Sequence, residues 1–214
     1  MLLETREAPP FHKNGYVVAC EETREAVLID PGDEVDALLR VVEQRKLGVR
    51  FVLLTHAHVD HVSGTARAKA ATGAPVCLHR DDLPLYAAAP QQAAFFGLDV
   101  ERLPAIDRFF DASSSIDFGT LSARVLPTPG HTPGGVCFLV GPSGTAGTTL
   151  FSGDTLFAGS IGRTDLPGGD YRTLIESIRG VLLALPDVVV VHAGHGPGTT
   201  IGRERRTNPF LGGE

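Results

Sequence analysis

The spacing of apolar positions along the chain changes repeatedly between the period of a strand and that of a helix. This pattern predicts strands interleaved with helices. Short apolar runs rich in β-branched residues are typical of strands. They lie at Tyr16–Cys20, Ala26–Ile29, Arg50–Leu54, Pro75–Leu78, Leu121–Leu126, Val136–Val140, Thr149–Ser152 and Val188–Val191. Apolar residues at helical spacing predict one helix between Asp33 and Lys46 and another between Leu174 and Leu185. The pattern indicates a layered α/β protein with hairpins and a mixed sheet.

The segment from Asp81 to Gly97 interrupts this alternation. It is rich in Ala and Gln, contains two prolines and includes the pair Phe95-Phe96. We expect a broken helix that projects from the core as a lid or an insertion, with the phenylalanines either walling an entrance or packing in the core. No linker is long enough to separate domains, so residues 1–214 are expected to form one domain.

Composition narrows the class of protein. Hydrophobic residues make up 43% and charged residues 21%, as in ordinary globular proteins. The net charge of −6 argues against a nucleic-acid partner, because phosphate binding needs clustered Lys and Arg. No apolar run has the length of a signal peptide core or a membrane span. Three scattered cysteines suggest core positions in a reducing compartment. We therefore expect a cytoplasmic protein without a membrane partner.

Four apolar runs end in residues that can bind a metal ion. These runs are FVLLTHAHVDH, ARVLPTPGH, TLFSGD and VVVVHAGH. Side chains at strand ends are held by the sheet and meet in one crevice. The first run places His56, His58, Asp60 and His61 within six positions. A His-rich turn that caps a following helix is the alternative, but a bound divalent cation better explains crowded imidazoles and a carboxylate.

Further ligands have to come from elsewhere in the chain, because six residues cannot close two sites. His131, Asp154 and His195 each have a neighbouring glycine, which lets the backbone bend toward a shared centre. His195 is preferred over His192 because it occupies the glycine-flanked turn. Asp30 in LIDPG is expected to orient a ligand rather than to bind the metal.

The series THAHVDH, GHTPGG, SGD and GHGPGT, in this order, resembles the metallo-β-lactamase superfamily and, within it, the glyoxalase II-like (hydroxyacylglutathione hydrolase-like) branch. The resemblance implies a four-layer αβ/βα sandwich with two mixed sheets. It also implies two divalent metal ions, zinc or iron. The first ion would be held by His56, His58 and His131, the second by Asp60, His61 and His195, and Asp154 would bridge them.

The activity implied by the resemblance is hydrolysis of an acyl thioester, such as S-lactoylglutathione, by a metal-bound hydroxide. Asp60 and Asp154 are the expected catalytic residues. Arg163 in SIGRTDLPGGD is expected to bind a substrate carboxylate, since a guanidinium forms paired hydrogen bonds with one. A small thiol-derived molecule is the expected partner. The sequence is compatible with a homodimer but does not decide the oligomeric state.

Two other functions compete with this hypothesis. The GRTD sequence also resembles persulfide dioxygenases of the same superfamily, in which a single iron held by residues matching His56, His131 and Asp154 oxidises glutathione persulfide. The HGPGT and NPFL segments near the end favour the hydrolase. A non-catalytic binding module on the same scaffold would have lost ligands, whereas every ligand position is filled here.

Overall fold

Two six-stranded mixed sheets form the centre of the computed structural model, which describes residues 1–111 and 114–212. The first sheet has the order β1 (Leu2–Ala8), β2 (Lys13–Ala19), β3 (Glu25–Ile29), β4 (Gly48–Leu53), β5 (Val76–His79) and β6 (Arg108–Phe110). The second has the order β14 (Thr199–Thr200), β13 (Val190–Ala193), β10 (Thr149–Gly153), β9 (Val136–Pro142), β8 (Leu121–Pro127) and β7 (Ser115–Phe118). A small hairpin pairs β11 (Leu156–Phe157) with β12 (Ser160–Ile161).

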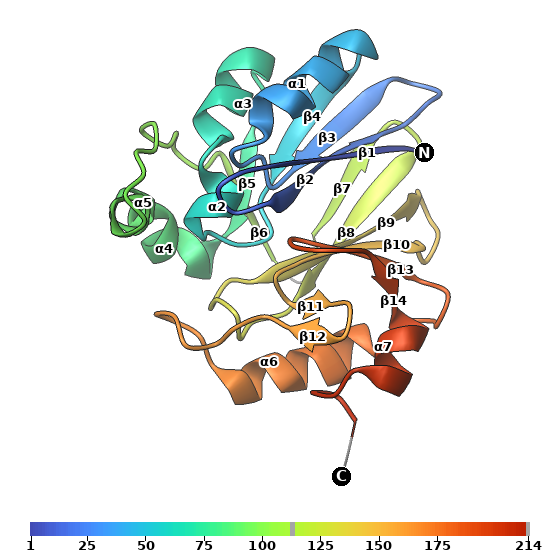
Figure 1. Cartoon of the computed structure of the whole chain (residues 1–214). Helices are drawn as coiled ribbons and strands as arrows, with labels where there is room; N and C mark the ends of the chain where they lie inside the picture. Colours follow the sequence, from blue (N-terminus) through green and yellow to red (C-terminus); the bar gives the residue numbers. More distant parts are fainter. Residues whose placement is uncertain (112–113, 213–214) are drawn as a thin grey trace.

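Helices cover the outer face of each sheet (Figure 1). The first sheet carries α1 (Val35–Gln44) and α3 (Thr65–Thr72), and the second carries α6 (Tyr171–Ser177), a π-helical turn (Ile178–Leu182) and α7 (Ile201–Thr207). The short α2 (Val59–Val62) follows β4, while a 3-10 turn (Arg80–Asp82), α4 (Leu83–Ala87) and α5 (Ala89–Phe95) project at one side. This is the four-layer αβ/βα arrangement that the resemblance implied.

Alternate residues of the central strands enter different cores, and this explains their continuous apolar runs. In β2, Val17 and Ala19 pack under the helices of the first sheet, whereas Tyr16 and Val18 pack between the two sheets. In β9, Phe138 faces the layer between the sheets and Leu139 faces α6. Strands buried on both faces lose the alternation of polar and apolar residues. Each sheet is therefore a rigid platform for the loops at its strand ends.

Each of the eight predicted strands overlaps an observed one, and both predicted helices are present with different bounds. The second begins at Tyr171 rather than near Leu174, because the Asp170 side chain accepts a hydrogen bond from the Thr173 N–H at 2.7 Å and caps it earlier. The segment from Asp81 is a broken helix, as expected. None of the helices in the described ranges is long and apolar enough to cross a membrane.

Candidate metal centre

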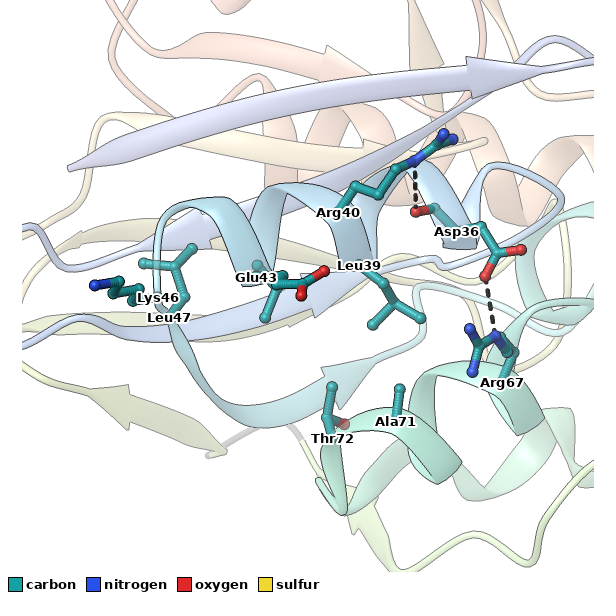
Figure 2. Close-up of a pocket in the computed structure, with 10 residues that line it drawn as sticks. Asp36, Leu39, Arg40, Glu43, Lys46, Leu47, Arg67, Ala71 and Thr72 are labelled. Atoms are coloured by element: carbon teal, nitrogen blue, oxygen red, sulfur yellow. Dashed lines mark hydrogen bonds and ion pairs between the residues drawn. The ribbon is translucent and has the colours of Figure 1, made fainter.

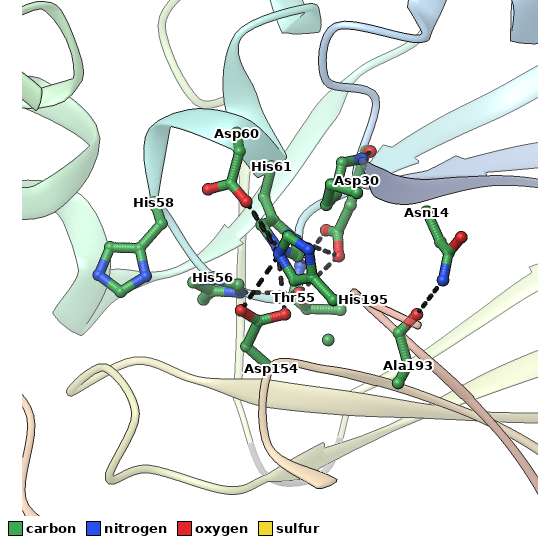
Figure 3. Close-up of polar contacts among 12 residues, drawn as sticks. Asn14, Asp30, Thr55, His56, His58, Asp60, His61, Asp154, Ala193 and His195 are labelled. Atoms are coloured by element: carbon green, nitrogen blue, oxygen red, sulfur yellow. Dashed lines mark hydrogen bonds and ion pairs between the residues drawn. The ribbon is translucent and has the colours of Figure 1, made fainter. Parts of the chain in front are cut away.

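The four runs that end in ligand-type residues lie at the ends of strands β4, β8, β10 and β13, and their side chains meet at one edge of the two sheets. Figure 3 shows the residues that follow β4, β10 and β13. The structure brings together all seven of the predicted ligands, which are His56, His58, Asp60, His61, His131, Asp154 and His195. Strand ends from both sheets supply them. The predicted convergence is therefore present in the fold.

The first cluster consists of three buried imidazoles, from His56, His58 and His131. One nitrogen from each lies within 4.8 Å of the others, and His58 Nδ1 is 2.9 Å from His131 Nε2. His58 sits at the N-cap of α2 in extended backbone, which turns its ring toward His131. Three converging imidazole nitrogens are a ligand set that zinc and iron both accept.

The second cluster consists of Asp60, His61 and His195. His195 Nε2 lies 3.1 Å from Asp60 Oδ2, and His61 Nε2 lies 3.6 Å from the same oxygen. Asp154 stands between the clusters, with Oδ1 3.2 Å from His61 Nε2 and Oδ2 3.7 Å from His131 Nε2. One carboxylate is thus within reach of both clusters.

Hydrogen bonds behind the rings fix which nitrogen of each imidazole faces the centre. His131 Nδ1 donates to the carbonyl of Arg163 at 2.8 Å, and His61 Nδ1 donates to Asp30 Oδ2 at 2.9 Å. Thr55 Oγ1 donates to Asp30 Oδ2 at 2.6 Å, so it accepts from His56 Nδ1 at 3.1 Å. In each ring the outer nitrogen carries the proton, so the inner nitrogen presents a lone pair, which a metal requires.

Buried atoms without partners mark the same centre. Within the described residues, His56 Nε2, His61 Nε2 and Asp154 Oδ1 are buried and make no hydrogen bond. Buried polar atoms are nearly always hydrogen-bonded, because leaving one unsatisfied costs about 1–3 kcal/mol. Three such atoms pointing into one space fit a site for cations. The residues present therefore suit the metal ions that the resemblance implies.

The electrostatics of the cluster also favour added positive charge. Burial lowers the pKa of His58 to about 4 and holds the pKa of His56 well below its ordinary value. Burial opposes protonation of His61 too, but the surrounding carboxylates, Asp60 first, raise its pKa to about 10. The carboxylates therefore favour a bound cation, a charge that His56 and His58 do not supply by taking up protons. A divalent ion supplies that charge and leaves the imidazoles neutral as ligands.

Asp82 ties two ligand loops together, and the sequence analysis missed it. Its carboxylate is fully buried and accepts hydrogen bonds from Ala57 N at 2.9 Å, Thr132 Oγ1 at 2.9 Å and Gly134 N at 2.6 Å. Burial raises its pKa although these donors oppose the shift. A signal was available, because Asp82 follows the apolar run of β5 closely, as the ligands follow theirs.

The loop that carries His195 is held by β2. Tyr16 Oη donates to the carbonyl of Ala193 at 2.6 Å, and Asn14 Nδ2 donates to the same oxygen at 3.1 Å. His192 points elsewhere, because its ring stacks on Phe151 at 5.4 Å. His195, and not His192, therefore lies in the cluster with Asp60 and His61.

A glycine is required where the last loop passes the clusters. A Cβ atom at Gly194 would lie 2.2 Å from Asp154 Oδ1 and 2.6 Å from His61 Cε1. No side chain fits there without displacing a ligand. The backbone of this loop closes the site on the side of β13.

Asp30 orients ligands as expected, and a buried ion pair supports its turn. The Asp30 carboxylate also accepts from Thr55 N at 2.7 Å. Lys13 Nζ donates to the Asp30 carbonyl and to Glu34 Oε1, the latter at 2.7 Å, and both side chains are buried. The turn that positions Asp30 is thus fixed by charge-assisted hydrogen bonds.

Arg163 is placed differently from the other predicted residues. Its guanidinium is exposed and forms paired hydrogen bonds of 2.8 Å with the carboxylate of Asp165. Its backbone carbonyl, rather than its side chain, serves the centre by holding His131. Binding of a substrate carboxylate by Arg163 stays a prediction that requires this pair to open.

A larger hollow on the molecule lies away from these residues. It has a volume of about 660 Å³ and runs between α1 and α3 (Figure 2). Two of its charged side chains, Arg67 and Asp36, form an ion pair with a distance of 2.9 Å. None of the seven clustered residues lines it. Size alone therefore does not locate the chemistry in this protein.

Comparison with known proteins places this geometry in a family. The family model described as "Metallo-beta-lactamase superfamily" matches residues 8–195. The chain belongs to the metallo-β-lactamase superfamily. It is 39% identical over 213 residues to the hydroxyacylglutathione hydrolase GloC of Haemophilus influenzae, covering 99% of this chain and 98% of that protein.

Two solved structures of the superfamily are similar over nearly the whole chain. The structure titled as TTHA1623 in a di-iron-bound form has a TM-score of 0.86 and 44% identity, covering 97% of this chain and 100% of that one. ETHE1 from Myxococcus xanthus has a TM-score of 0.81 and 28% identity, covering 98% and 84%. Membership of this superfamily makes the chain a metallo-hydrolase, and its His and Asp cluster is suited to binding metal ions.

Proposed function

We propose that this metallo-hydrolase cleaves acyl thioesters of the glyoxalase II type, such as S-lactoylglutathione or a related compound. The observation that carries the proposal is the pair of His- and Asp-containing clusters joined by Asp154. His56, His58 and His131 would hold one ion, Asp60, His61 and His195 the other, and Asp154 would bridge them. The similarity to GloC supports a thioester as the substrate class.

Zinc or iron ions, when bound there, would lower the pKa of water toward neutrality and polarise the substrate carbonyl. The side chains around the ligands serve to position them. Asp30, Thr55 and the carbonyl of Arg163 accept hydrogen bonds from the outer ring nitrogens of His61, His56 and His131, so the inner nitrogens are the ones available to a metal. Asp82 holds two ligand loops together. A thiolate leaves readily because the thiol pKa is about 8.5. The reaction therefore makes little demand for a general acid.

Loss of thioester cleavage in Asp60→Ala and Asp154→Ala tests this proposal. Each substitution removes a carboxylate that reaches the clusters, so we expect kcat/KM for S-lactoylglutathione to fall by orders of magnitude in the metal-loaded protein. Asp81→Ala, an exposed aspartate, is the matched control. A β-lactam substrate assayed alongside checks the reaction class. Full activity in both cluster variants contradicts the proposal.

The persulfide dioxygenase is the second candidate, and the similarity to ETHE1 is the observation that favours it. It predicts one iron per chain and oxygen uptake with glutathione persulfide. The hydrolase predicts two ions per chain and no oxygen uptake. Elemental analysis of metal per chain, followed by an oxygen electrode on the iron-loaded protein, separates the two.

A further inference from the structure

An apolar pocket opens beside the first cluster. It has a volume of about 440 Å³ and borders His58. Its other walls come from α4, α5 and the loop that follows Arg163, and its apolar lining consists of Leu85, Ala88, Phe95, Phe96, Leu166 and Pro167. Sites for small molecules span about 300–1,000 Å³, so the pocket has room for a substrate group. Figure 1 shows α4 and α5 standing beside α2, which carries part of the ligand motif.

The wall of this pocket is fixed to the ligand loop. Gln92 accepts a hydrogen bond from Val59 N at 3.0 Å and donates to the carbonyl of Leu85 at 3.0 Å, so its amide joins α5 to both α2 and α4. The ring of Phe96 meets Phe11 edge-on at 5.2 Å, which ties the end of α5 to the turn between β1 and β2. The pocket is thus held open at a defined distance from His58.

The chemistry of the lining selects what can enter. In the described part of the chain, no Asp, Glu, Lys or Arg side chain lines the pocket. Its polar lining consists of His58, Gln91 and Gln92, and Gln92 uses both ends of its amide on the backbone, so it offers little to a polar ligand. A charged or strongly hydrated group would lose its water without compensation, whereas a hydrocarbon would gain from burial. Biological carrier thiols are chains of amides and charges, so the acyl side of a thioester suits this lining better.

From these observations we infer that the pocket beside His58 binds the acyl group of the substrate and selects thioesters of apolar acyl groups over those of small polar ones. The inference rests on the proposed thioesterase function and refines its substrate class, since S-lactoylglutathione, whose acyl group is small and polar, is then expected to have a lower kcat/KM than thioesters of apolar acyl groups. Phe95 and Phe96 are large apolar side chains that are exposed, at 85% and 53%. An apolar acyl chain covers these rings and accounts for their position beside the centre.

A series of acetyl, butyryl and hexanoyl thioesters of glutathione tests the inference with the metal-loaded protein. We expect kcat/KM to rise about threefold to fourfold per added methylene, because burying one CH₂ is worth about 0.8 kcal/mol. Ala88→Phe fills the pocket, so the hexanoyl-to-acetyl ratio of kcat/KM is expected to fall at least tenfold. Ala87→Phe, an exposed neighbour outside the lining, keeps the wild-type ratio.

Phe96→Ala is the second variant, since it removes an exposed ring and does not depend on fitting a larger side chain. It is also expected to lower the hexanoyl-to-acetyl ratio. A flat acyl series, or an unchanged ratio in both variants, overturns the inference while leaving thioester cleavage intact. A dependence on the length of an alkyl thiol, at constant acetyl group, would overturn the acyl assignment. Absence of cleavage for every thioester overturns the proposed function itself.

Discussion

Replacing Asp30 by Asn is expected to weaken metal binding without removing any ligand. Oδ1 of Asp30 accepts from Thr55 N, and Oδ2 accepts from both Thr55 Oγ1 and His61 Nδ1. If the oxygen of the introduced amide serves Thr55 N, the NH₂ group of that amide faces the other two donors. His61 must then accept at Nδ1 and carry its proton on Nε2, where the metal should bind. The isosteric change thus reverses the tautomer rather than the fold.

The magnitude follows from the position of this contact one step behind the ligands. Loss of a partner that orients a metal-bound histidine typically lowers affinity about 10- to 100-fold, which corresponds to about 1.4–2.7 kcal/mol. Thr55 relays the same reversal to His56 through its hydroxyl, so both clusters are affected. Thr55→Val removes the relay and leaves the contact between Asp30 and His61, so it should weaken the first cluster alone.

Competition with a chromophoric chelator measures the affinities, and elemental analysis counts the ions per chain. Urea unfolding of the metal-free proteins shows whether the variants keep their fold. Asp33→Asn, which alters an exposed carboxylate near the same turn, is the control and should bind metal like the wild type. Two ions bound to Asp30→Asn with unchanged affinity would refute the tautomer argument.

Three further predictions follow from the site. Removing both metals with a chelator should lower the melting temperature by about 16–32 °C, because each of the two ions, present at a thousandfold over its Kd, adds about 4 kcal/mol; calorimetry checks this, and an unchanged transition contradicts the assignment. Asp82→Ala leaves two buried backbone N–H groups unsatisfied, so urea unfolding should show a loss of about 2–6 kcal/mol, against about 0.5 kcal/mol or less for Asp81→Ala. Gly194→Ala places a methyl against Asp154 and should reduce the metal content per chain, whereas Gly180→Ala, with open space around it, should not.

The metal centre could be predicted because it follows from local pattern. Apolar runs fix where strands end, and the sheet then fixes where the next few side chains converge. Strand β1 could not be found in this way, since its sequence LLETREA mixes charged residues into an edge strand that is only half-buried. Its pairing with β2 over seven residues, rather than its own hydrophobicity, holds it in the sheet.

The groups that contact the ligands from behind were less predictable, because their contacts join residues that are far apart in sequence. Asp82 reaches donors that lie 25, 50 and 52 residues away in sequence. Lys13 and Glu34 form a buried ion pair, and the residues next to them in sequence give no indication of it. Phe95 is exposed, whereas the sequence left packing in the core open as an alternative for it. Periodicity places a side chain on a face, but only the fold selects its partner.

The distribution of ligands between the two halves of the fold has a consequence for stability. His56 and His58 follow a strand of the first sheet, whereas His131 follows a strand of the second; Asp60 and His61 are likewise joined by His195 from the second sheet. Each ion would therefore connect both sheets at the edge where they meet. Protein contacts already bridge this edge, through Asp82 on one side and Tyr16 on the other. Because bound metal favours only the state in which both sheets are docked, its binding free energy adds to the free energy of unfolding of the whole assembly rather than of one half.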